Sequence, residues 1–516
     1  MSVTSSPSIS WSDPERSEAL IKQSREALEA EFGGRLWIVA FPVLVAAEAI
    51  AKQLISLGAE RVLAVGVTEG VRGSAEPEPC AELERLCLHG DLLGLDYMNG
   101  IRGAERLLDQ LNEEQLAQVE RFDPQGEALV IRVIFSESDS FAGRRVYGAR
   151  RASWMALEDK LIIDALWDEV GIKRSPSMKS KLSLSELIEA AELLDRGYGV
   201  VIAGDNRSGY HGGAARTRWA RGPKQLNRIA QELSKECDEA RVMPYLKGVS
   251  CSIHGWVFPQ GEISLRPCEM LVYESEETCF EYLGAAIHWR PNDRVKAQMI
   301  EAAERVARHL KEQLDYRGVF TIDGIADEER FYPTELNPRF GGAIARMALI
   351  TPQLPLLLMH YATIEGALSA LDIQGLRGLI LEASELSSSI RPSQGLKAPC
   401  ERQEEAHFVY RDEAWRRCEA ELEGASVVRW GPAQLGSMLI VTAAQSSFED
   451  GAPTLPRCLT LLEAAQEHFV GSRLAQEGAA SDAGASSAEE VAGEDQVEED
   501  QDEATPRSKP KVIRLS

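Results

Sequence analysis

The chain has 516 residues, of which 44% are hydrophobic, and a formal net charge of −25 at pH 7. This length and composition fit a globular protein with several domains. The strong negative charge argues against a nucleic-acid-binding surface, which requires a basic patch.

The nine cysteines show no C-x-x-C pair and no regular spacing. An odd, irregular set of this kind is typical of reduced thiols in a cytoplasmic protein. The stretch MSVTSSPSIS lacks the apolar segment of a signal peptide, and no apolar run reaches membrane-spanning length. We therefore expect a cytoplasmic protein without membrane contact.

The first domain is predicted to be α/β and to cover residues 1–147. Between Arg35 and Gly70, an apolar run, a segment with a period near four and a second apolar run predict strand, helix and strand in turn. A further buried strand is predicted within Gly126–Phe135. The loop after the second strand does not match G-x-G-x-x-G, which argues against dinucleotide binding.

The next segment predicts helices and strands around a glycine-rich loop. WMALEDKLIIDALWDEVG predicts a helix ending at Gly171, and LSLSELIEAAELLDRG predicts another ending at Gly197. YGVVIAG then predicts a strand, followed by the loop DNRSGYHGGA.

Two successive strands are predicted from RVMPYLKGVSCSIHGWVF and GEISLRPCEMLVYE, with a turn at Pro259–Gly261. A long amphipathic helix follows over Arg294–Leu314, and then a hairpin with its loop at Ala326–Arg330. Residues 378–473 predict a mixed α/β region without a recognised motif. Residues 474–516 predict a disordered acidic tail, because eleven acidic and no basic residues lie between Ala475 and Ala504.

The hairpin carries the most informative chemistry, in the stretch TELNPRFGG. Side chains alternate along a strand, so Glu335, Asn337 and Arg339 are predicted to share one face, and Asp323 on the partner strand can join them. Two carboxylates and an amide offer the oxygen ligands that Mg²⁺ prefers, and an arginine can hold a phosphate. From spacing alone, a set of polar residues that only solvates a hairpin remains the alternative.

These residues also resemble a known family. The pattern G-V-F-x-x-D followed by E-L-N-P-R-x-G-G is similar to the C-terminal signature of the ATP-grasp superfamily. The resemblance implies an ATP-grasp fold over residues 148–377, with two α+β lobes, about 150–242 and about 243–377, that clasp ATP. Residues 1–147 resemble the Rossmann-like pre-ATP-grasp domain. The residues matching Asp323, Glu335 and Asn337 bind metal ions on ATP phosphates in this superfamily.

Other motifs precede the signature in the expected order. L-E-D-K contains a lysine similar to the one that contacts the α-phosphate, SGYHGGA resembles the phosphate-covering flap, and VMPYLKG resembles the linker that pairs with adenine. Ser250 stands near the position where many members have a ribose-binding glutamate, so the candidate for the ribose is an acid on the next strand, and the absence of any such residue is the alternative. The implied ATP-contacting residues are Lys160, Ser208, Gly209, Gly212, Gly213, Met243, Tyr245, Leu246 and Glu269. Taken singly, each could instead be an ordinary helix, turn or core residue.

The chain departs from the family pattern in one respect. The strand before the flap usually carries a second lysine, in V-V-K, where this chain has Val200, Val201 and Ile202 followed by Ala203. A flap cation is hypothesised to replace it, from Arg207, Arg216 or Arg218. The flap itself is weakly similar to the S-G-x-G-N-A type of pheganomycin-type peptide ligases.

The resemblance implies an ATP-dependent carboxylate–amine ligase that uses ATP and Mg²⁺ and forms an amide or peptide bond through an acyl phosphate. Arg339 and Lys160 are the implied catalytic residues, and Arg290 or His288 is a candidate to contact the substrate carboxylate. The implied partners are small-molecule carboxylate and amine substrates, and a homodimer is left open. The main alternative is a nucleotide-binding or scaffold module that lost turnover with the second lysine, and carboxylase-like or kinase-like ATP-grasp chemistry is also left open.

Overall fold

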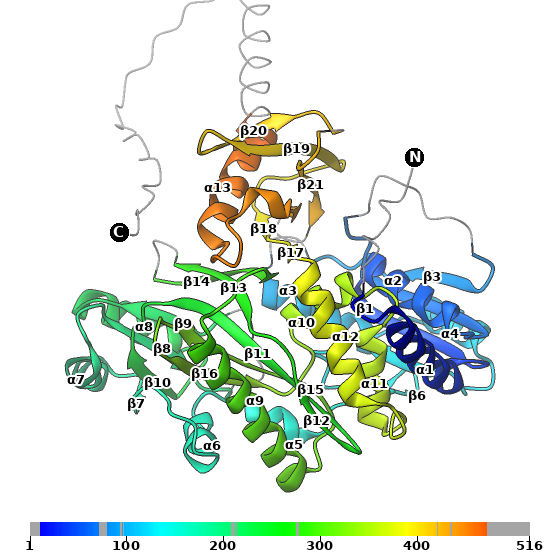
Figure 1. Cartoon of the computed structure of the whole chain (residues 1–516), viewed down its shortest axis with the longest axis horizontal. Coiled ribbons are helices and arrows are strands. Elements are labelled where there is room, and N and C mark those ends of the chain that lie inside the picture. Colours follow the sequence, from blue (N-terminus) through cyan, green and yellow to red (C-terminus); the bar gives the residue numbers. More distant parts are fainter. Residues whose placement is uncertain are drawn as a thin grey trace, which may run out of the picture. The chain divides into compact units, whose positions relative to one another are not determined.

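The computed structural model describes residues 11–71, 80–92, 95, 97–207, 212, 214–274, 278–420, 422–433 and 436–471. It divides into two compact units, residues 1–465 and 466–516. The predicted flap residues Ser208, Gly209 and Gly213 and the predicted acidic tail lie outside the described residues. Figure 1 shows the elements in chain order.

The N-terminal sheet has four parallel strands in the order β3-β2-β1-β4. Its central strands are buried along almost their whole length, as expected for a parallel sheet that is covered on both faces. The strands are β1 (Leu36–Val43), β2 (Arg61–Thr68), β3 (Leu83–Cys87) and β4 (Leu129–Arg132), and the helices are α1 (Pro14–Phe32), α2 (Leu44–Ser56), α3 (Tyr97–Asp109) and α4 (Glu113–Phe122). A short ribbon follows, formed by β5 (Ser140–Phe141) and β6 (Arg144–Arg145). The predicted strand–helix–strand order is confirmed.

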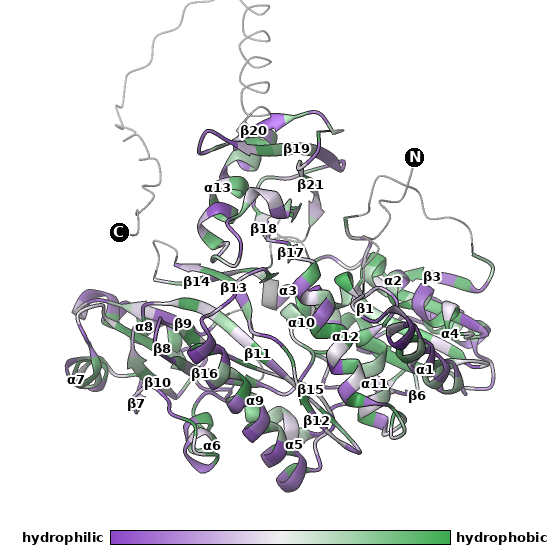
Figure 2. Cartoon of the chain, viewed as in Figure 1, coloured by the Kyte–Doolittle hydropathy of each residue, from purple (hydrophilic) through white to green (hydrophobic). Residues whose placement is uncertain are grey.

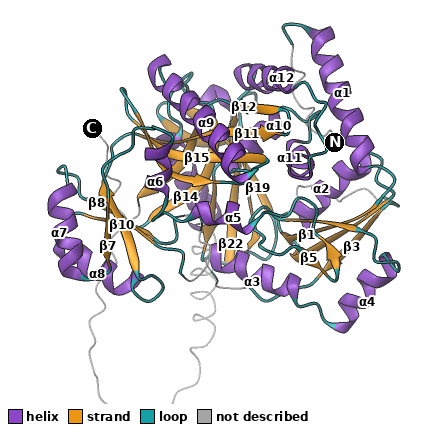
Figure 3. Cartoon of the chain, turned by 90° about the horizontal axis from the view of Figure 1, so that it is seen from below, coloured by secondary structure: helices purple, strands orange, loops and turns teal. Residues whose placement is uncertain are grey.

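A second sheet is antiparallel, in the order β7-β10-β8-β9. Its strands are β7 (Met178–Lys181), β8 (Val200–Gly204), β9 (Thr217–Ala220) and β10 (Glu239–Pro244), and its helices are α7 (Leu184–Leu194) and α8 (Pro223–Leu233). Apolar side chains of alternate strand positions pack with these two helices in one core. Figure 3 shows α7 and α8 beside the strands of this sheet. The two helices therefore cover only one face of this sheet.

The helix predicted to end at Gly171 is interrupted. The structure has α5 (Ala152–Met155), a 3₁₀ turn η1 (Ala156–Glu158) and α6 (Ile163–Glu169), with Lys160 in the turn between them. The Leu161 amide donates to the Asp159 carboxylate at 2.9 Å, which satisfies the backbone where the helix is broken. The single-helix prediction was wrong here because a local side-chain hydrogen bond competes with the helix.

The largest sheet is antiparallel, in the order β16-β15-β11-β13-β14-β17, with β12 paired to β11. Its strands are β11 (Val249–Phe258), β12 (Gly261–Ser264), β13 (Cys268–Glu274), β14 (Phe280–Ile287), β15 (Gly318–Ala326), β16 (Phe331–Asn337) and β17 (Ser389–Ile390). Each of the two long strands predicted upstream of the amphipathic helix is in fact two strands. The first is divided between β10 and β11, which belong to different sheets.

Opposite faces of this sheet carry different helices. The helix α9 (Asp293–Leu314) packs on one face. It is amphipathic and carries both hydrophobic and hydrophilic residues (Figure 2). On the other pack α10 (Gly342–Ile350), α11 (Leu356–Glu365) and α12 (Ile373–Leu386). These three helices share a core with β1 and α2, so the N-terminal sheet and the largest sheet are joined through them.

The C-terminal sheet is antiparallel, in the order β18-β22-β21-β19-β20. Its strands are β18 (Ser393–Leu396), β19 (Glu404–Arg411), β20 (Ala414–Cys418), β21 (Ser426–Ala433) and β22 (Gly436–Thr442). The 3₁₀ turn η2 (Gln445–Ser447), the helix α13 (Leu455–Gln466) and the π-helical turn η3 (Glu467–Gly471) complete the described chain. Residue 378, where a mixed region was predicted to begin, lies inside α12, and the predicted domain boundaries stay predictions.

None of the nine cysteines forms a disulfide. Among the described residues, no helix has both the length and the apolar character needed to cross a membrane.

Candidate functional site

The candidate site lies on the face of the largest sheet that is opposite α9. The register of β11, β15 and β16 places Ser252, Asp323 and Glu335 in one row across the sheet. The next residue of β16, Leu336, is 1% exposed and packs in the α9 core. Alternation along the strand therefore puts the polar side chains on one face and the apolar ones on the other, as the sequence predicted.

Asn337 lies at the centre of the polar cluster. Its Nδ2 donates to Asp323 Oδ2 at 2.7 Å and to Glu335 Oε1 at 3.0 Å. Its Oδ1 accepts a hydrogen bond from Arg339 Nη2 at 2.8 Å. One amide thus joins both carboxylates to the arginine, and the four residues predicted from the hairpin lie together.

Lys160 reaches this cluster from the turn between η1 and α6. Its Nζ lies 2.6 Å from Glu335 Oε2, and the two side chains are 12% and 28% exposed. The lysine thus compensates the charge of the hairpin acids, even though more than 170 residues separate it from them in sequence. Its neighbour Glu158 also contacts the hairpin side of the site, through Arg339.

The two carboxyl groups differ in acidity. Burial and the neighbouring Glu335 carboxylate raise the pKa of Asp323 well above its usual value. Burial also acts to raise the pKa of Glu335, but the charge of Lys160 and hydrogen bonds from Lys160 and Asn337 outweigh it and hold that pKa below its usual value. The pair is a strong attractor for a cation, since a divalent ion would relieve the repulsion between the carboxylates.

Arg339 is held between two lobes of the site. Its Nε lies 3.3 Å from Glu158 Oε1, and the same oxygen is 2.5 Å from Arg150 Nη1. The guanidinium carbon of Arg339 lies 4.7 Å from the ring centre of Phe135, which follows β4 of the N-terminal sheet. Glu158, Arg150 and Phe135 were missed by the sequence analysis, because only the fold brings these segments next to the hairpin.

The loop after Arg339 passes close to the sheet. A side chain at Gly341 would place its Cβ 2.4 Å from Thr321 Oγ1 and 3.0 Å from His254 Nε2, so the position requires glycine. Thr321 Oγ1 and both imidazole nitrogens of His254 are buried and have no hydrogen-bond partner in the described part of the chain. Burial lowers the pKa of His254 to about 3, so its imidazole is neutral. Unpaired buried polar atoms next to Asn337 mark a place where a bound ligand or water is needed.

The donor set fits a magnesium ion. Asp323 and Glu335 converge on a single positively polarised group, the Asn337 Nδ2, which occupies a position between their oxygens. Two carboxylates and an amide that can present its oxygen are the hard ligands of a cation that takes its remaining ligands from phosphate and water. The residues that could hold the ion are therefore Asp323, Glu335 and Asn337.

The small-lobe sheet turns its second face away from α7 and α8. Val201, Met243 and Trp219 form one row across β8, β10 and β9 on that face. Tyr245 follows β10, its ring centre lies 5.0 Å from that of Trp219, and its hydroxyl donates to Glu274. Of the predicted adenine-contacting residues, Tyr245 forms an aromatic pair with Trp219, Met243 lies in the same sheet row as Trp219, and Leu246 follows in the partly exposed linker.

Ile202 and Ala203, the two positions of β8 that matter for the second lysine, lie on opposite faces of the sheet. Ile202 is fully buried in the core with α7 and α8, so a lysine there would point away from the site. Ala203 is the position on the opposite face, in a row with Arg241 and Lys179 on the neighbouring strands. Alternation along the strand shows which residues share a face, but only the packing against α7 and α8 shows that Ala203 rather than Ile202 lies on the face away from the core.

The flap arginines are engaged with acids. Arg216 is 2% exposed and pairs with Glu236, Arg207 pairs with Asp238, and Arg218 pairs with Glu232. Of the flap glycines, only Gly212 is described, and its carbonyl accepts from the Ala215 amide at 3.1 Å.

Arg241 is buried at 1% exposure, and its Nη2 lies 2.6 Å from Asp164 Oδ1. Its Nη1 also donates to the carbonyl of Thr334, next to Glu335, at 2.8 Å. Lys179 is exposed and has no ion pair among the described residues. Of these cations, Lys179 is the one available to a ligand, and no motif in the sequence pointed to it.

Glu269 does not lie with the candidate site. It pairs in register with Cys251, whose side chain packs in the α9 core, on the face opposite Asp323. Glu269 is 1% exposed and accepts hydrogen bonds from Thr454 N, Thr454 Oγ1 and Leu455 N at 2.7 to 3.0 Å. This carboxylate holds the start of α13, so the structure does not bring Glu269 together with the other candidate residues.

The candidates for substrate binding near Trp289 have structural partners as well. Arg290 pairs with Asp450 at 2.8 Å and with Glu385 at 3.3 Å. The ring nitrogens of His288 lie 3.1 Å from Ser388 Oγ and 2.8 Å from the carbonyl of Glu449. Both residues connect the largest sheet to the segment before α13.

Comparison with known proteins agrees with this architecture. No protein-family model matches the sequence, and no curated protein matches it. Among solved structures, the biotin carboxylase domain of 2-oxoglutarate carboxylase from Hydrogenobacter thermophilus, in complex with MgADP, ADP and bicarbonate, matches with a TM-score of 0.50 and 15% identity, over 80% of this chain and 86% of that chain. Biotin carboxylase from Campylobacter jejuni matches with a TM-score of 0.49 and 14% identity, over 80% and 89%. L-amino acid ligase from Bacillus licheniformis matches with a TM-score of 0.44 and 11% identity, over 80% and 94%.

The chain has the ATP-grasp fold. At these sequence identities the similarity establishes the fold alone, and the chemistry has to be argued from the site.

Proposed function

We propose that this protein is an ATP-dependent ligase that activates a carboxylate as an acyl phosphate and joins it to an amine, forming an amide or peptide bond. The observation that carries the proposal is the convergence of Asp323, Glu335 and Asn337 with Lys160 and Arg339 in one cluster. Within an ATP-grasp fold, this set has the charges needed to hold a metal-bound triphosphate and the group transferred from it.

Each residue of the cluster has a distinct task. Asp323, Glu335 and Asn337 would hold Mg²⁺, which when bound neutralises charge on the phosphate oxygens. Lys160 lies within reach of the same point and would bind a phosphate oxygen once Glu335 turns to the metal. Arg339 is fixed in orientation by Asn337 and Glu158 and would stabilise the transferring phosphoryl group.

The small-lobe face would receive the rest of the nucleotide. Trp219 and Tyr245 offer an aromatic surface next to Met243, where a base can pack against side chains and pair with the linker backbone. Lys179 is exposed on the same face as Ala203 and would supply the second small-lobe cation. The absence of a lysine in β8 is thus compensated from the strand β7, two positions away in the sheet.

The reaction needs no side-chain nucleophile. A substrate carboxylate oxygen attacks the γ-phosphorus, and the bond to the β-phosphate oxygen breaks, which releases ADP and leaves an acyl phosphate. The amine then attacks the acyl carbon and phosphate leaves, with the amine proton passing to solvent or phosphate. Positioning and charge stabilisation account for such a mechanism, and we propose an amino acid or peptide as the substrate and the cytoplasm as its location.

Hydroxylamine trapping tests this proposal without knowledge of the natural amine. The full-length protein is incubated with Mg·ATP, hydroxylamine and pools of amino acids, short peptides and small carboxylic acids, and hydroxamates are identified by mass spectrometry. We expect a hydroxamate that requires Mg²⁺ and disappears in Glu335→Gln. The matched control is Glu329→Gln, which changes an exposed acid in the loop of the same hairpin and should leave the product unchanged.

Two outcomes would count against the proposal. ATP binding without any hydroxamate, across all the pools, would favour the alternative of a nucleotide-binding module that lacks turnover. A hydroxamate that persists in Glu335→Gln would show that the cluster is not the metal site. Direct measurement of Mg·ATP affinity by calorimetry separates these cases.

A further inference from the structure

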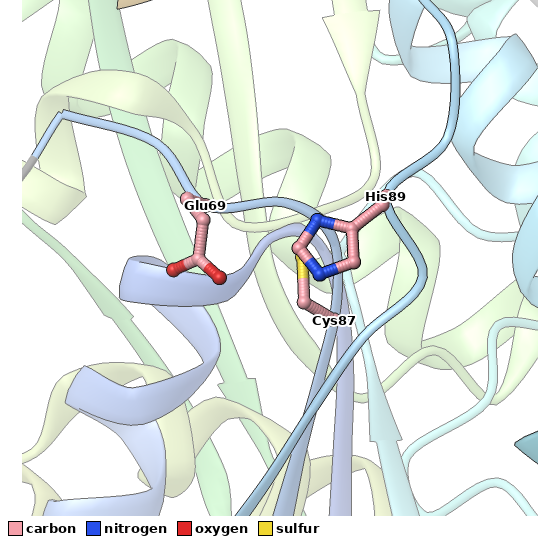
Figure 4. A group of neighbouring side chains, drawn as sticks. All are labelled: Glu69, Cys87 and His89. Carbon is pink, nitrogen blue, oxygen red and sulfur yellow. The ribbon is translucent and has the colours of Figure 1, made fainter.

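A second group of ligating side chains lies in the N-terminal sheet, away from the hairpin. Glu69 follows β2, Cys87 ends β3, and His89 comes two residues later. One ligand atom from each, a carboxylate oxygen, the thiol sulfur and an imidazole nitrogen, lie within 4.8 Å of one another. Figure 4 shows the Glu69 carboxylate and the His89 imidazole facing each other, with the sulfur of Cys87 beside the imidazole.

The backbone fixes the positions of these residues. The amides of Leu88 and Gly90 donate to the carbonyls of Gly66 and Val67 at 2.8 and 3.0 Å, so the chain on both sides of His89 is attached to β2. The carbonyl of Glu69 accepts from the Val45 amide at 3.2 Å, near the start of α2. The three side chains therefore project from anchored backbone rather than from a free loop.

Their place in the fold is also suited to ligand binding. β2 and β3 are adjacent parallel strands, paired up to Gly66 and Cys87, and the three residues lie at their carboxyl ends. Ligands of open α/β sheets bind on the side of the sheet where the carboxyl ends of the strands lie. Glu69 and His89 are exposed and Cys87 is partly exposed, so an ion can reach all three.

The chemistry of the donors selects the ion. A thiolate, an imidazole and a carboxylate together suit a borderline transition metal such as Zn²⁺, whereas Mg²⁺ and Ca²⁺ prefer oxygen ligands alone. Three protein ligands leave the fourth position of a tetrahedral zinc ion for water or another small ligand.

We propose that Glu69, Cys87 and His89 form a binding site for one Zn²⁺-class ion, with its fourth coordination position open to solvent. The site is separate from the magnesium cluster of the hairpin: it belongs to another sheet and uses a different donor set. The ion would join the ends of β2 and β3.

Metal titration of the full-length protein tests the site. The protein is freed of metal with a chelator under reducing conditions and titrated with Co²⁺, which reports thiolate ligation through a near-ultraviolet charge-transfer band. Zn²⁺ affinity is then measured by competition with a chromophoric chelator. We expect one equivalent to bind, with the charge-transfer band lost in Cys87→Ser.

Single substitutions identify the ligands. Cys87→Ser, His89→Gln and Glu69→Gln should each weaken Zn²⁺ binding by about 100-fold or more, since even changes outside the ligand shell cost about 10–100-fold. Cys80→Ser is the matched control, because it removes another thiol just before β3 and should bind Zn²⁺ like the wild type. Absence of a stoichiometric Zn²⁺ site, or a site that persists in the Cys87→Ser, His89→Gln double variant, would overturn the proposal.

Discussion

Replacing Glu335 by glutamine removes one charge from the centre of the candidate site while keeping the shape of the side chain. In the structure Glu335 lies 2.6 Å from Lys160 and shares the Asn337 amide with Asp323. The substitution therefore changes two opposing interactions at once: it removes an attraction to the lysine and a repulsion from the second carboxylate.

The effect on stability follows from these two interactions. At 2.6 Å and an effective dielectric constant of about 20, the ion pair alone amounts to about 6 kcal/mol before desolvation. Desolvation of the partly buried groups cancels most of this, and Asp323 becomes free to ionise and pair with Lys160 once Glu335 is neutral. We expect a net loss of about 1 kcal/mol, which for a cooperative unit of this size corresponds to about 1 °C in melting temperature.

The effect on turnover should be much larger. A metal ligand contributes several kcal/mol to stabilising the charge that develops on phosphate, and each 1.36 kcal/mol is about tenfold in rate. Glu335→Gln should therefore lower kcat/KM by at least about 100-fold and raise the Mg²⁺ concentration needed for half-maximal rate. The assay is ADP release over a Mg²⁺ titration, with thermal unfolding in EDTA as the check on folding and Glu329→Gln as control. A folded Glu335→Gln protein with turnover within about threefold of the wild type would refute the metal assignment.

Two further predictions concern other parts of the chain. Lys179→Met should raise the KM for ATP by about tenfold, because one charge-assisted contact of about 1.4 kcal/mol would be lost. Lys224→Met should leave the KM unchanged, since Lys224 lies on a helix that covers the other face of the sheet. Equal KM values for the two variants would show that Lys179 does not contact ATP. Asp123 is fully buried and pairs with Arg144 at 3.0 Å; burial acts to raise its pKa, but hydrogen bonds from Arg144 and from backbone amides outweigh it and lower that pKa. Asp123→Asn should therefore destabilise the protein by about 3 kcal/mol near neutral pH. Because the folded pKa is the lower one, the difference should shrink as the pH falls below about 3.9 and the carboxyl becomes protonated. Melting curves from pH 7 to pH 3 would contradict this if the difference grew on acidification.

The hairpin was predictable because its information is local. The two strands are joined by a short loop, so their register follows from a few residues, and alternation places Glu335 and Asn337 on one face with Leu336 on the other. The same short-range logic predicted the first strand, helix and strand of the N-terminal sheet. The sequence pattern and the structure agree where residues close together in the sequence determine how an element pairs and which face it buries.

Positions that depend on packing were not predictable in the same way. The residues VVIA alternate in either phase, and only packing against α7 and α8 shows that Ala203 rather than Ile202 faces the site. Glu269 is an acid on the strand predicted to contact the ribose. Its carboxylate instead accepts hydrogen bonds from Thr454 and Leu455, on the face of the sheet opposite Asp323. In both cases the deciding contacts come from segments distant in sequence.

The apolar run that was predicted as one strand is a further case in which distant contacts decide the structure, because it is divided between the two lobes. β10 and β11 look continuous in hydrophobicity, yet they pair in different sheets and are separated by the linker after Pro244. Gly248 within that linker has a φ of 155°, and an added Cβ would lie 2.4 Å from the carbonyl of Ala326. The change from one sheet to the other thus depends on the backbone conformation of Gly248 and on its close contact with Ala326. Hydrophobic periodicity contains no information on either feature.

Two charged links tie the small lobe to the strand that carries the proposed metal ligands, and a nucleotide would affect the two links differently. Arg241 donates to the carbonyl of Thr334 and is itself neutralised by Asp164, so this link involves no group that the proposed metal or phosphate needs. Lys160 instead pairs with Glu335, a group that the metal would claim. Binding of Mg·ATP would therefore exchange the second link for contacts to the ligand and leave the first intact. Because the first link persists, the lobes keep their spacing while Lys160 becomes available to phosphate, which is the preorganisation that phosphoryl transfer requires.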